Sequence, residues 1–131
     1  MTEPRWVPRL VVDSAHLDQL REHGGLPGVR DENALEAALA RARQKWNYEP
    51  ESDLATLAAA YAFGLAKAHP FSDGNKRTAF ITMMAFLGLN DKELTTTEGE
   101  VVEVMVAVAD GSMAEAQLAG WIRARLTPLA F

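Results

Sequence analysis

Chemically capable side chains are concentrated between His69 and Phe80, where the chain reads His-Pro-Phe-Ser-Asp-Gly-Asn-Lys-Arg-Thr-Ala-Phe. A neutral imidazole can accept a proton from a hydroxyl, so His69 is a candidate general base. The Asp73 carboxylate is a hard oxygen ligand, of the kind that Mg²⁺ takes together with substrate phosphates and water. The segment therefore combines a possible proton acceptor with a possible metal ligand four residues further on.

The residues that follow Asp73 indicate a binding site for an anion. Lys76 and Arg77 follow a Gly-Asn pair, at a point where a helix is expected to begin. Each cation there costs about 0.3–1 kcal/mol unless an anion is bound, because the helix dipole is positive at that end. Gly74 allows backbone N–H groups to approach an anion closely, and Asn75 can cap the helix or fix the loop or phosphate. We therefore predict a polyphosphate site at a helix N-terminus.

Each feature also has an ordinary structural explanation. A histidine before a proline is usually a cation at a helix end, and Asp-Gly-Asn is usually a turn with an N-cap. The functional interpretation is favoured because these features occur together within nine residues, with two cations at the unfavourable end of a helix. Phe71 is expected to be a buried anchor of the loop, and Met83 and Met84 are expected in the core.

Two apolar helices are expected to position this segment. Helical spacing of apolar residues runs from Leu54 to Ala66, and that helix must end at His69 because Pro70 disfavours helical geometry in the residue before it. The following helix begins near Asn75 and is apolar on nearly all sides, which is typical of a central helix. The segment would then lie between the two central helices of the fold.

Two further helices are expected before this pair. Leu10 to Val12 suggests a short strand or extended lead-in, and Asp13 or Ser14 then caps a helix with Leu17 and Leu20 inward, stopped by Gly24. Asp31 caps the next helix. Trp46 to Ser52 is expected as a break, in which Trp46 and Tyr48 could belong to a flap for a polypeptide substrate, although simple packing is favoured. His16 and His23 are expected at the surface or at helix ends.

Two more helices follow. The β-branched run from Val101 to Val108 could be a strand, but the capping box from Thr97 to Glu100 favours a helix. A second capping box, from Ser112 to Glu115, is expected to open the last helix, with Leu118 to Leu126 providing its apolar face. The prediction is an all-α, compact bundle of about six helices.

Composition limits the function classes. The 131 residues are 48% apolar and 24% charged, which suits one globular domain over 1–131. The net charge of −5 argues against a general nucleic-acid or membrane-surface binder. The chain has no cysteine, no signal-peptide pattern, and no apolar run longer than Ala79 to Leu89, so a cytoplasmic protein is expected.

The segment resembles the signature of the Fic/Doc family, approximately His-Pro-Phe-x-(Asp/Glu)-Gly-Asn-Gly-Arg-x-x-Arg. Residues 69 to 75 and Arg77 match it position by position. Lys76 replaces the second signature glycine, and Phe80 stands where adenylylating members carry a second arginine. Both departures are similar to the death-on-curing (Doc) toxin branch, whereas Pro70 and Gly74 are closer to the Fic consensus.

The resemblance implies a toxin of a type II toxin–antitoxin pair. A Doc-type protein would be a serine/threonine protein kinase, transferring the ATP γ-phosphate to a threonine of elongation factor Tu and blocking translation. His69 would be the catalytic base, Asp73 the Mg²⁺ ligand, and Gly74, Asn75, Lys76 and Arg77 the phosphate-binding residues. The alternatives are a Fic-type adenylyltransferase and a non-catalytic binding module.

The resemblance also implies a partner. Many family members carry an inhibitory (Ser/Thr)-x-x-x-Glu-(Gly/Asn) motif, but the sole Glu-Gly here, Glu98-Gly99, has Leu94 at the Ser/Thr position. Restraint would then come from a Phd-like antitoxin, whose disordered C-terminal segment folds on binding.

Overall fold

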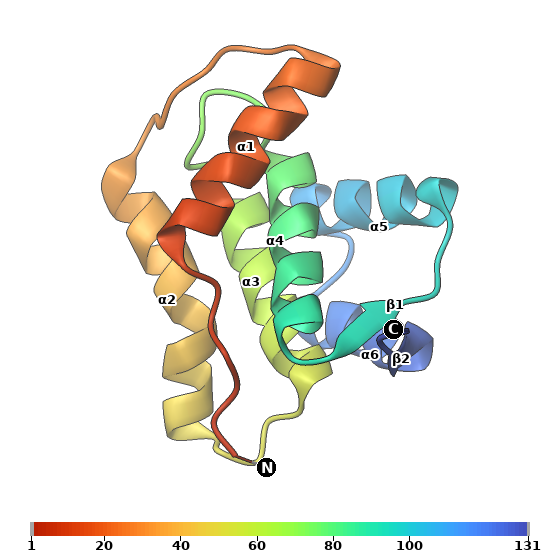
Figure 1. Cartoon of the computed structure of the whole chain (residues 1–131). Helices are drawn as coiled ribbons and strands as arrows, with labels where there is room; N and C mark the ends of the chain where they lie inside the picture. Colours follow the sequence, from red (N-terminus) through yellow and green to blue (C-terminus); the bar gives the residue numbers. More distant parts are fainter. Residues whose placement is uncertain (1, 131) are drawn as a thin grey trace.

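The computed structural model describes residues 2–130, which form six α-helices and one two-stranded antiparallel ribbon (Figure 1). The helices are α1 (Arg9–His23), α2 (Glu32–Tyr48), α3 (Leu54–Ala68), α4 (Asn75–Leu89), α5 (Glu98–Asp110) and α6 (Glu115–Arg125). The strands are β1 (Lys92–Leu94) and β2 (Leu126–Pro128), in register through Glu93 opposite Thr127. The predicted all-α bundle is confirmed, and the short ribbon was not predicted.

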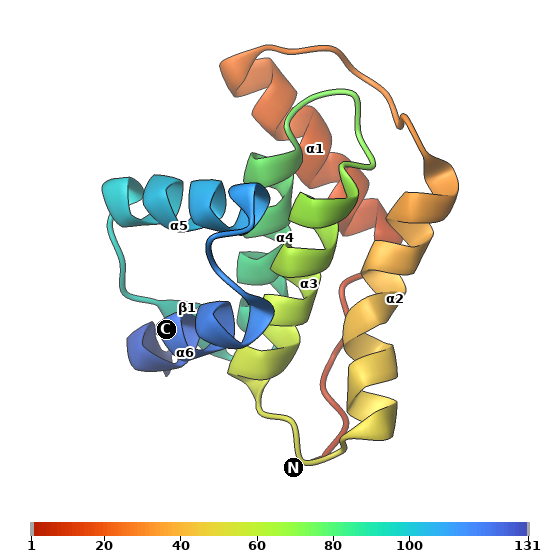
Figure 2. The ribbon, with the colours of Figure 1, turned by 180° about the vertical axis from the view of Figure 1, so that it is seen from behind.

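Helix α3 lies at the centre of the molecule, in contact with α2, α4, α5 and α6 (Figure 2). Its alanines explain this position, since a helix with small side chains on several faces allows close neighbours on each. Those at 55, 58, 59, 60, 62 and 66 are all buried. Large core residues that α3 and α4 contribute include Tyr61, Leu65, Met83 and Phe86.

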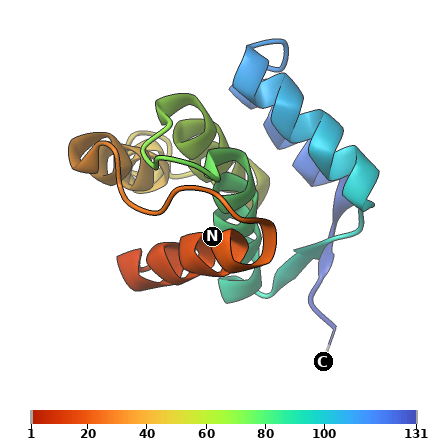
Figure 3. The same cartoon turned by 90° about the horizontal axis from the view of Figure 1, so that it is seen from above.

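Helix α4 packs against α3 and is flanked by α1 on one side and α5 on the other (Figure 3). The loop 69–74 joins the C-terminus of α3 to the N-terminus of α4, and it lies beside the connection between α1 and α2 (Figure 1). Both expected helices around this loop are therefore confirmed, and Met83 is buried while Met84 packs partly buried against the core.

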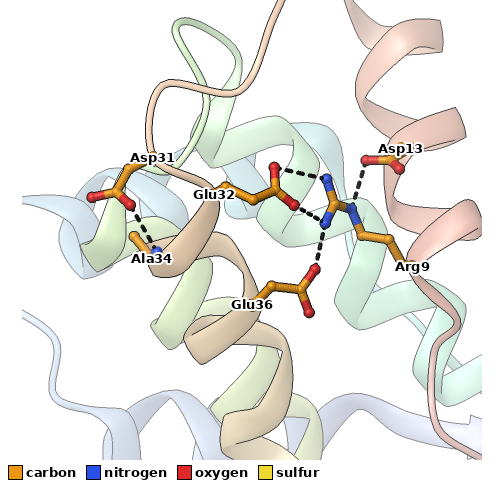
Figure 4. Close-up of polar contacts among 6 residues, drawn as sticks. All are labelled: Arg9, Asp13, Asp31, Glu32, Ala34 and Glu36. Atoms are coloured by element: carbon orange, nitrogen blue, oxygen red, sulfur yellow. Dashed lines mark hydrogen bonds and ion pairs between the residues drawn. The ribbon is translucent and has the colours of Figure 1, made fainter.

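The first helix begins earlier than expected. Pro8 is its N-cap in an extended conformation (φ −67°, ψ 148°), so Leu10 to Val12 are helical and neither Asp13 nor Ser14 is the cap. Asp13 instead accepts a bond from Arg9 Nε at 2.9 Å, and the same guanidinium pairs with Glu32 and Glu36 of α2 (Figure 4). This cluster ties the start of α1 to α2, and Gly24 stops α1 as expected (φ 79°).

Other helix ends were predicted with mixed success. Asp31 caps α2 by accepting a bond from Ala34 N–H at 3.0 Å, and Thr97 and Glu100 form the expected capping box of α5. Helix α2 continues to Tyr48, so the break begins at Glu49. The Ser112 capping box was wrong, because the last helix begins at Glu115.

The start of α6 is held by a different interaction. Its N-cap is Ala114, whose N–H donates to Gln117 Oε1 at 2.8 Å. Leu118 and Ile122 are buried on its inner face as expected, whereas Leu126 belongs to β2. No helix within residues 2–130 is long and apolar enough to cross a bilayer.

Candidate functional site

His69 is the C-cap of α3 and has a left-handed backbone conformation (φ 47°, ψ 54°) with an exposed side chain. A non-glycine residue in this conformation is unfavourable unless its surroundings enforce it. The His69 N–H donates to Leu65 O at 3.3 Å, and its carbonyl accepts a bond from Arg30 Nε at 3.0 Å. Helix α3 thus ends where Pro70 predicted, and the imidazole projects from that end.

The segment before α2 is hydrogen-bonded to the loop 69–74. The N–H groups of Arg30 and Asp31 donate to Pro70 O at 2.7 and 3.1 Å, and Ser72 N–H donates to Gly28 O at 3.1 Å. The Arg30 guanidinium bonds to the carbonyls of residues 68 and 69. Arg30 is therefore a structural clamp of the loop as well as a neighbour of the α2 cap.

Helix α1 contacts the buried side of the loop 69–74. Phe71 is 2% exposed, which confirms it as the anchor, and the His16 ring stacks on it with centroids 3.8 Å apart and planes at 14°. His16 Nε2 lies 2.9 Å from Asp73 O. The expectation of a surface position for His16 was wrong, since it is 7% exposed.

The inner face of α1 explains this error. Its buried residues are Val12, Ala15, His16 and Gln19, at helical spacing. Leu17, expected inward, is 46% exposed. The two leucines after Asp13 indicated a different inner face, because apolar residues were expected inward, whereas the face that packs on the loop contains the polar residues His16 and Gln19. His23 lies exposed at the end of α1, as expected.

Asp73 lies exposed on the loop, and its Oδ2 accepts a hydrogen bond from Leu26 N–H at 2.7 Å. Among residues 2–130, no group of three or more His, Asp or Glu side chains is placed to hold a metal ion. A single carboxylate suits Mg²⁺ bound together with substrate phosphates, because Mg²⁺ retains several waters and takes one or two carboxylates. The donor set therefore fits a shared substrate–metal site rather than an all-protein metal cage.

The N-terminus of α4 carries no side-chain cap and no acidic residue in its first turn. Gly74 is the N-cap, in a left-handed conformation (φ 78°, ψ 20°). Asn75 does not cap the helix. Its Oδ1 accepts from Phe71 N–H at 2.9 Å and its Nδ2 donates to Phe71 O at 3.0 Å, so its side chain fixes the loop. The first-turn N–H groups, which have no partner within a helix, are thus left for a ligand.

The two cations lie exposed beside this helix end, next to a hollow of ≈ 360 Å³ between α4 and α5. Its lining is Gly74, Lys76, Arg77, Phe80, Val101, Val102, Met105 and Val106. The hollow thus has a cationic side at the helix end and an apolar side formed by α5. Such a mixture suits a ligand with both an anionic and an apolar part.

Trp46 and Tyr48 do not belong to this site. Trp46 packs edge-on against Trp6, with ring centroids 6.2 Å apart, and Tyr48 is 90% exposed. Both lie near the C-terminal end of α2, at the opposite end of the molecule from the loop 69–74 (Figure 1). The favoured packing explanation holds for Trp46, and it is the segment before α2, without Trp46 or Tyr48, that is hydrogen-bonded to the loop 69–74.

Comparison with known proteins agrees with this architecture. The sequence model of the Fic/DOC family matches residues 7–87, which run from the start of α1 through most of α4. The chain is 32% identical over 108 residues to "Protein kinase doc" of Escherichia phage P1, covering 82% of this chain and 85% of that protein. It is 34% identical over 111 residues to "Toxin Doc" of Mycolicibacterium smegmatis, covering 79% and 85% respectively.

The chain therefore belongs to the Fic/Doc family. Both relatives carry the Doc name, in agreement with the branch that Lys76 and Phe80 indicated. The roles of the individual site residues are not tested by these similarities and stay predictions.

Proposed function

We propose that this protein is the toxin of a type II toxin–antitoxin pair and acts as a Mg²⁺- and ATP-dependent protein kinase. The observation that carries the proposal is the N-terminus of α4. It combines first-turn N–H groups that have no partner among residues 2–130, two exposed cations and the adjacent Asp73 carboxylate, with His69 at the facing helix end. The names of the two relatives, a protein kinase and a toxin, support the same activity.

In the proposed reaction, His69 accepts the proton of a threonine hydroxyl. The hydroxyl oxygen forms a bond to the γ-phosphorus while the bond to the bridging oxygen breaks, and ADP leaves with that electron pair. Bound Mg²⁺ would neutralise charge on the phosphate oxygens, and Asp73 would hold it. Gly74, Lys76 and Arg77 would bind the phosphates directly, and Asn75 would act by fixing the loop.

A second candidate is adenylyl transfer, which moves AMP instead of the γ-phosphate. Phe80 is the observation that disfavours it. One turn after Lys76, Phe80 lines the hollow with an apolar side chain where an adenylylating member would place an arginine. With Lys76 in place of a glycine, the cations gather at the first turn of α4, which favours the γ-phosphate near His69.

Elongation factor Tu is the proposed substrate, and a Phd-like antitoxin is the proposed partner. A kinase that inactivates a vital factor must be restrained, and the sequence has no inhibitory motif of the family type. The restraining segment would be disordered alone and would fold as a helix on an apolar groove of this chain. A short neighbouring reading frame that encodes a DNA-binding N-terminus and a charged tail would fit this proposal. A toxin without a cotranscribed small partner would contradict it.

Induced expression in a bacterial host tests the activity against a non-catalytic binding module. The parent should arrest growth, and His69→Ala should relieve the arrest while its circular dichroism spectrum stays unchanged. His23→Ala is the matched control, because His23 is exposed at the end of α1, outside the site, and it should remain toxic. Equal toxicity of His69→Ala and the parent would refute the catalytic assignment.

A further inference from the structure

Gln19 lies on the inner face of α1 and is 2% exposed. Neither its Nε2 nor its Oε1 has a hydrogen-bond partner among residues 2–130. An amide in this state is unfavourable, because each buried polar atom has lost water without gaining a partner. A leucine or methionine of similar volume would stabilise the ligand-free protein better than glutamine does.

The unpaired amide is pressed against the N-cap of α4. A Cβ atom added to Gly74 would lie 1.8 Å from Gln19 Nε2 and 2.5 Å from Gln19 Cδ. The amide thus fills the space that any side chain at position 74 would need. Two independent features therefore favour glycine at position 74, namely this contact and the left-handed backbone conformation.

Gln19 is the second unfavourable feature at one helix end. The first is the pair of cations, Lys76 and Arg77, at the positive end of the α4 dipole. A bound anion removes the unfavourable charge arrangement, and the buried amide is aimed at the same turn. Features that lower the stability of the ligand-free protein are expected at sites where the ligand-bound state is the functional one.

We propose that Gln19 is a positioning residue for the phosphate cradle, and that its amide is hydrogen-bonded only when a polyphosphate occupies the N-terminus of α4. It acts through the Asp73–Gly74 backbone, which it supports from the side of α1. The inference rests on the part of the proposed function that places polyphosphate at this helix end. It does not depend on which group is transferred.

The variant Gln19→Leu tests the proposal, because a positioning role and a purely structural role predict different results. The thermal midpoint of the ligand-free variant should rise by a few degrees, since the unpaired amide is gone. Its dissociation constant for Mg²⁺-ATP, measured by calorimetry, should rise about tenfold, the loss expected for one hydrogen bond made only in the bound state. An unchanged dissociation constant would overturn the proposal.

Thr82→Val is the matched control. Thr82 is fully buried on α4, and its Oγ1 also lacks a partner within the described part of the chain, but it lies two turns from Gly74 and outside the site. This variant should gain stability without any change in nucleotide affinity. A tenfold loss of affinity in Thr82→Val would show that the effect of Gln19→Leu reports general core changes, and it would overturn the inference.

Gln19→Met and a spectroscopic measurement keep the test valid if leucine disrupts the fold. The Gln19 side-chain NH₂ pair, assigned by its absence in Gln19→Met, should shift downfield in proton frequency when Mg²⁺-ATP is added to the parent. A pair that does not move at saturating nucleotide would contradict the proposal. Failure of the parent to bind any polyphosphate would refute both proposals, whereas binding without phosphotransfer would refute the kinase activity alone.

Discussion

At the scale of single residues, the predicted catalytic side chains depend on neighbours that the motif does not contain. His69 is fixed by the Arg30 guanidinium at its carbonyl, and Asp73 is held by Leu26 N–H at its carboxylate and by His16 at its carbonyl. These bonds leave the His69 imidazole exposed while restricting the backbone that carries it. Residues 69–77 therefore carry the predicted catalytic side chains, and α1 with the segment before α2 fixes the backbone that positions them.

Truncation of His16 should show how much this support contributes. His16→Ala removes the stack on Phe71 and the bond to Asp73 O, and we expect it to lower the free energy of unfolding by about 2–3 kcal/mol in urea titrations. His16→Phe is the matched variant, because it keeps an aromatic stack and loses only the hydrogen bond, at a cost of about 1 kcal/mol. Equal unfolding midpoints for His16→Ala and the parent would contradict this account of the loop.

The cations of α4 should show opposite effects on binding and stability. Lys76→Ala and Arg77→Ala should each weaken Mg²⁺-ATP binding, yet raise the free energy of unfolding of the ligand-free protein by about 0.3–1 kcal/mol, because they remove a charge from the positive end of a helix. Arg21→Ala is the control. Arg21 lies in the last turn of α1, where a cation is favourable, so this variant should not gain stability. Loss of stability in both α4 variants would contradict the anion-site interpretation.

At the scale of elements, sequence patterns predicted helices better than they predicted helix starts. Asp31, Asp53 and Thr97 all cap helices through local bonds. Asp13-Ser14 has the same composition as a cap, yet Asp13 pairs with Arg9 inside α1. The distinction depends on the Arg9 cluster with α2, a tertiary contact that no local pattern contains. The ribbon of β1 and β2 was not predicted for a related reason. Each strand is short and is defined by its pairing with a strand that is distant in the sequence.

In the candidate site as well, the sequence predicted what is local and missed what depends on tertiary contacts. Residues 69 to 77 are contiguous, so their joint chemistry could be recognised from sequence. His16, Gln19 and Leu26 come from other elements, and their contacts with the loop exist only after α1 packs against α4. Spacing along the chain carries no information about such contacts.

Asp53 provides the prediction at this scale, because it joins α3 to α6. Its Oδ1 accepts from Thr56 N–H at 2.9 Å as the cap of α3, and its Oδ2 accepts from Arg123 Nε at 2.7 Å. Asp53→Ala should lower the free energy of unfolding by about 1–2 kcal/mol, mostly through the cap, since an exposed ion pair contributes less than about 1 kcal/mol. Arg123→Ala removes the ion pair and the bond from Arg123 to Thr56 Oγ1 but keeps the cap, so its smaller loss separates the contribution of the cap from that of the Arg123 contacts.

The same residue predicts a pH dependence. The Arg123 guanidinium, followed by the bonds from Thr56, holds the pKa of Asp53 well below its usual range in the folded protein. The folded state therefore binds this proton less readily than the unfolded state, and the stabilisation is present above the unfolded pKa and lost as the pH falls below about 4. Unfolding curves from pH 7 to pH 2.5 should show a smaller decline for Asp53→Asn than for the parent. Parallel declines would contradict this assignment.

At the scale of the whole molecule, the bundle brings one end of α3 and one end of α4 together at a surface that α1 and α5 flank (Figure 3). The C-terminal end of α3 presents His69, and the N-terminal end of α4 presents the turn that is predicted to bind an anion. The family match covers α1 to most of α4, the part that builds this arrangement, whereas α5 adds the apolar wall of the adjacent hollow. The activity that we propose for this arrangement is transfer of the ATP γ-phosphate to a protein hydroxyl.

Parallel incubation of the protein and purified elongation factor Tu with γ-labelled and α-labelled ATP, in the presence of Mg²⁺, tests that claim most directly. His69→Ala serves as the inactive control in both reactions. We predict label on elongation factor Tu from γ-labelled ATP alone, and none with His69→Ala. Label retained from α-labelled ATP would contradict the kinase assignment and establish adenylyl transfer in its place.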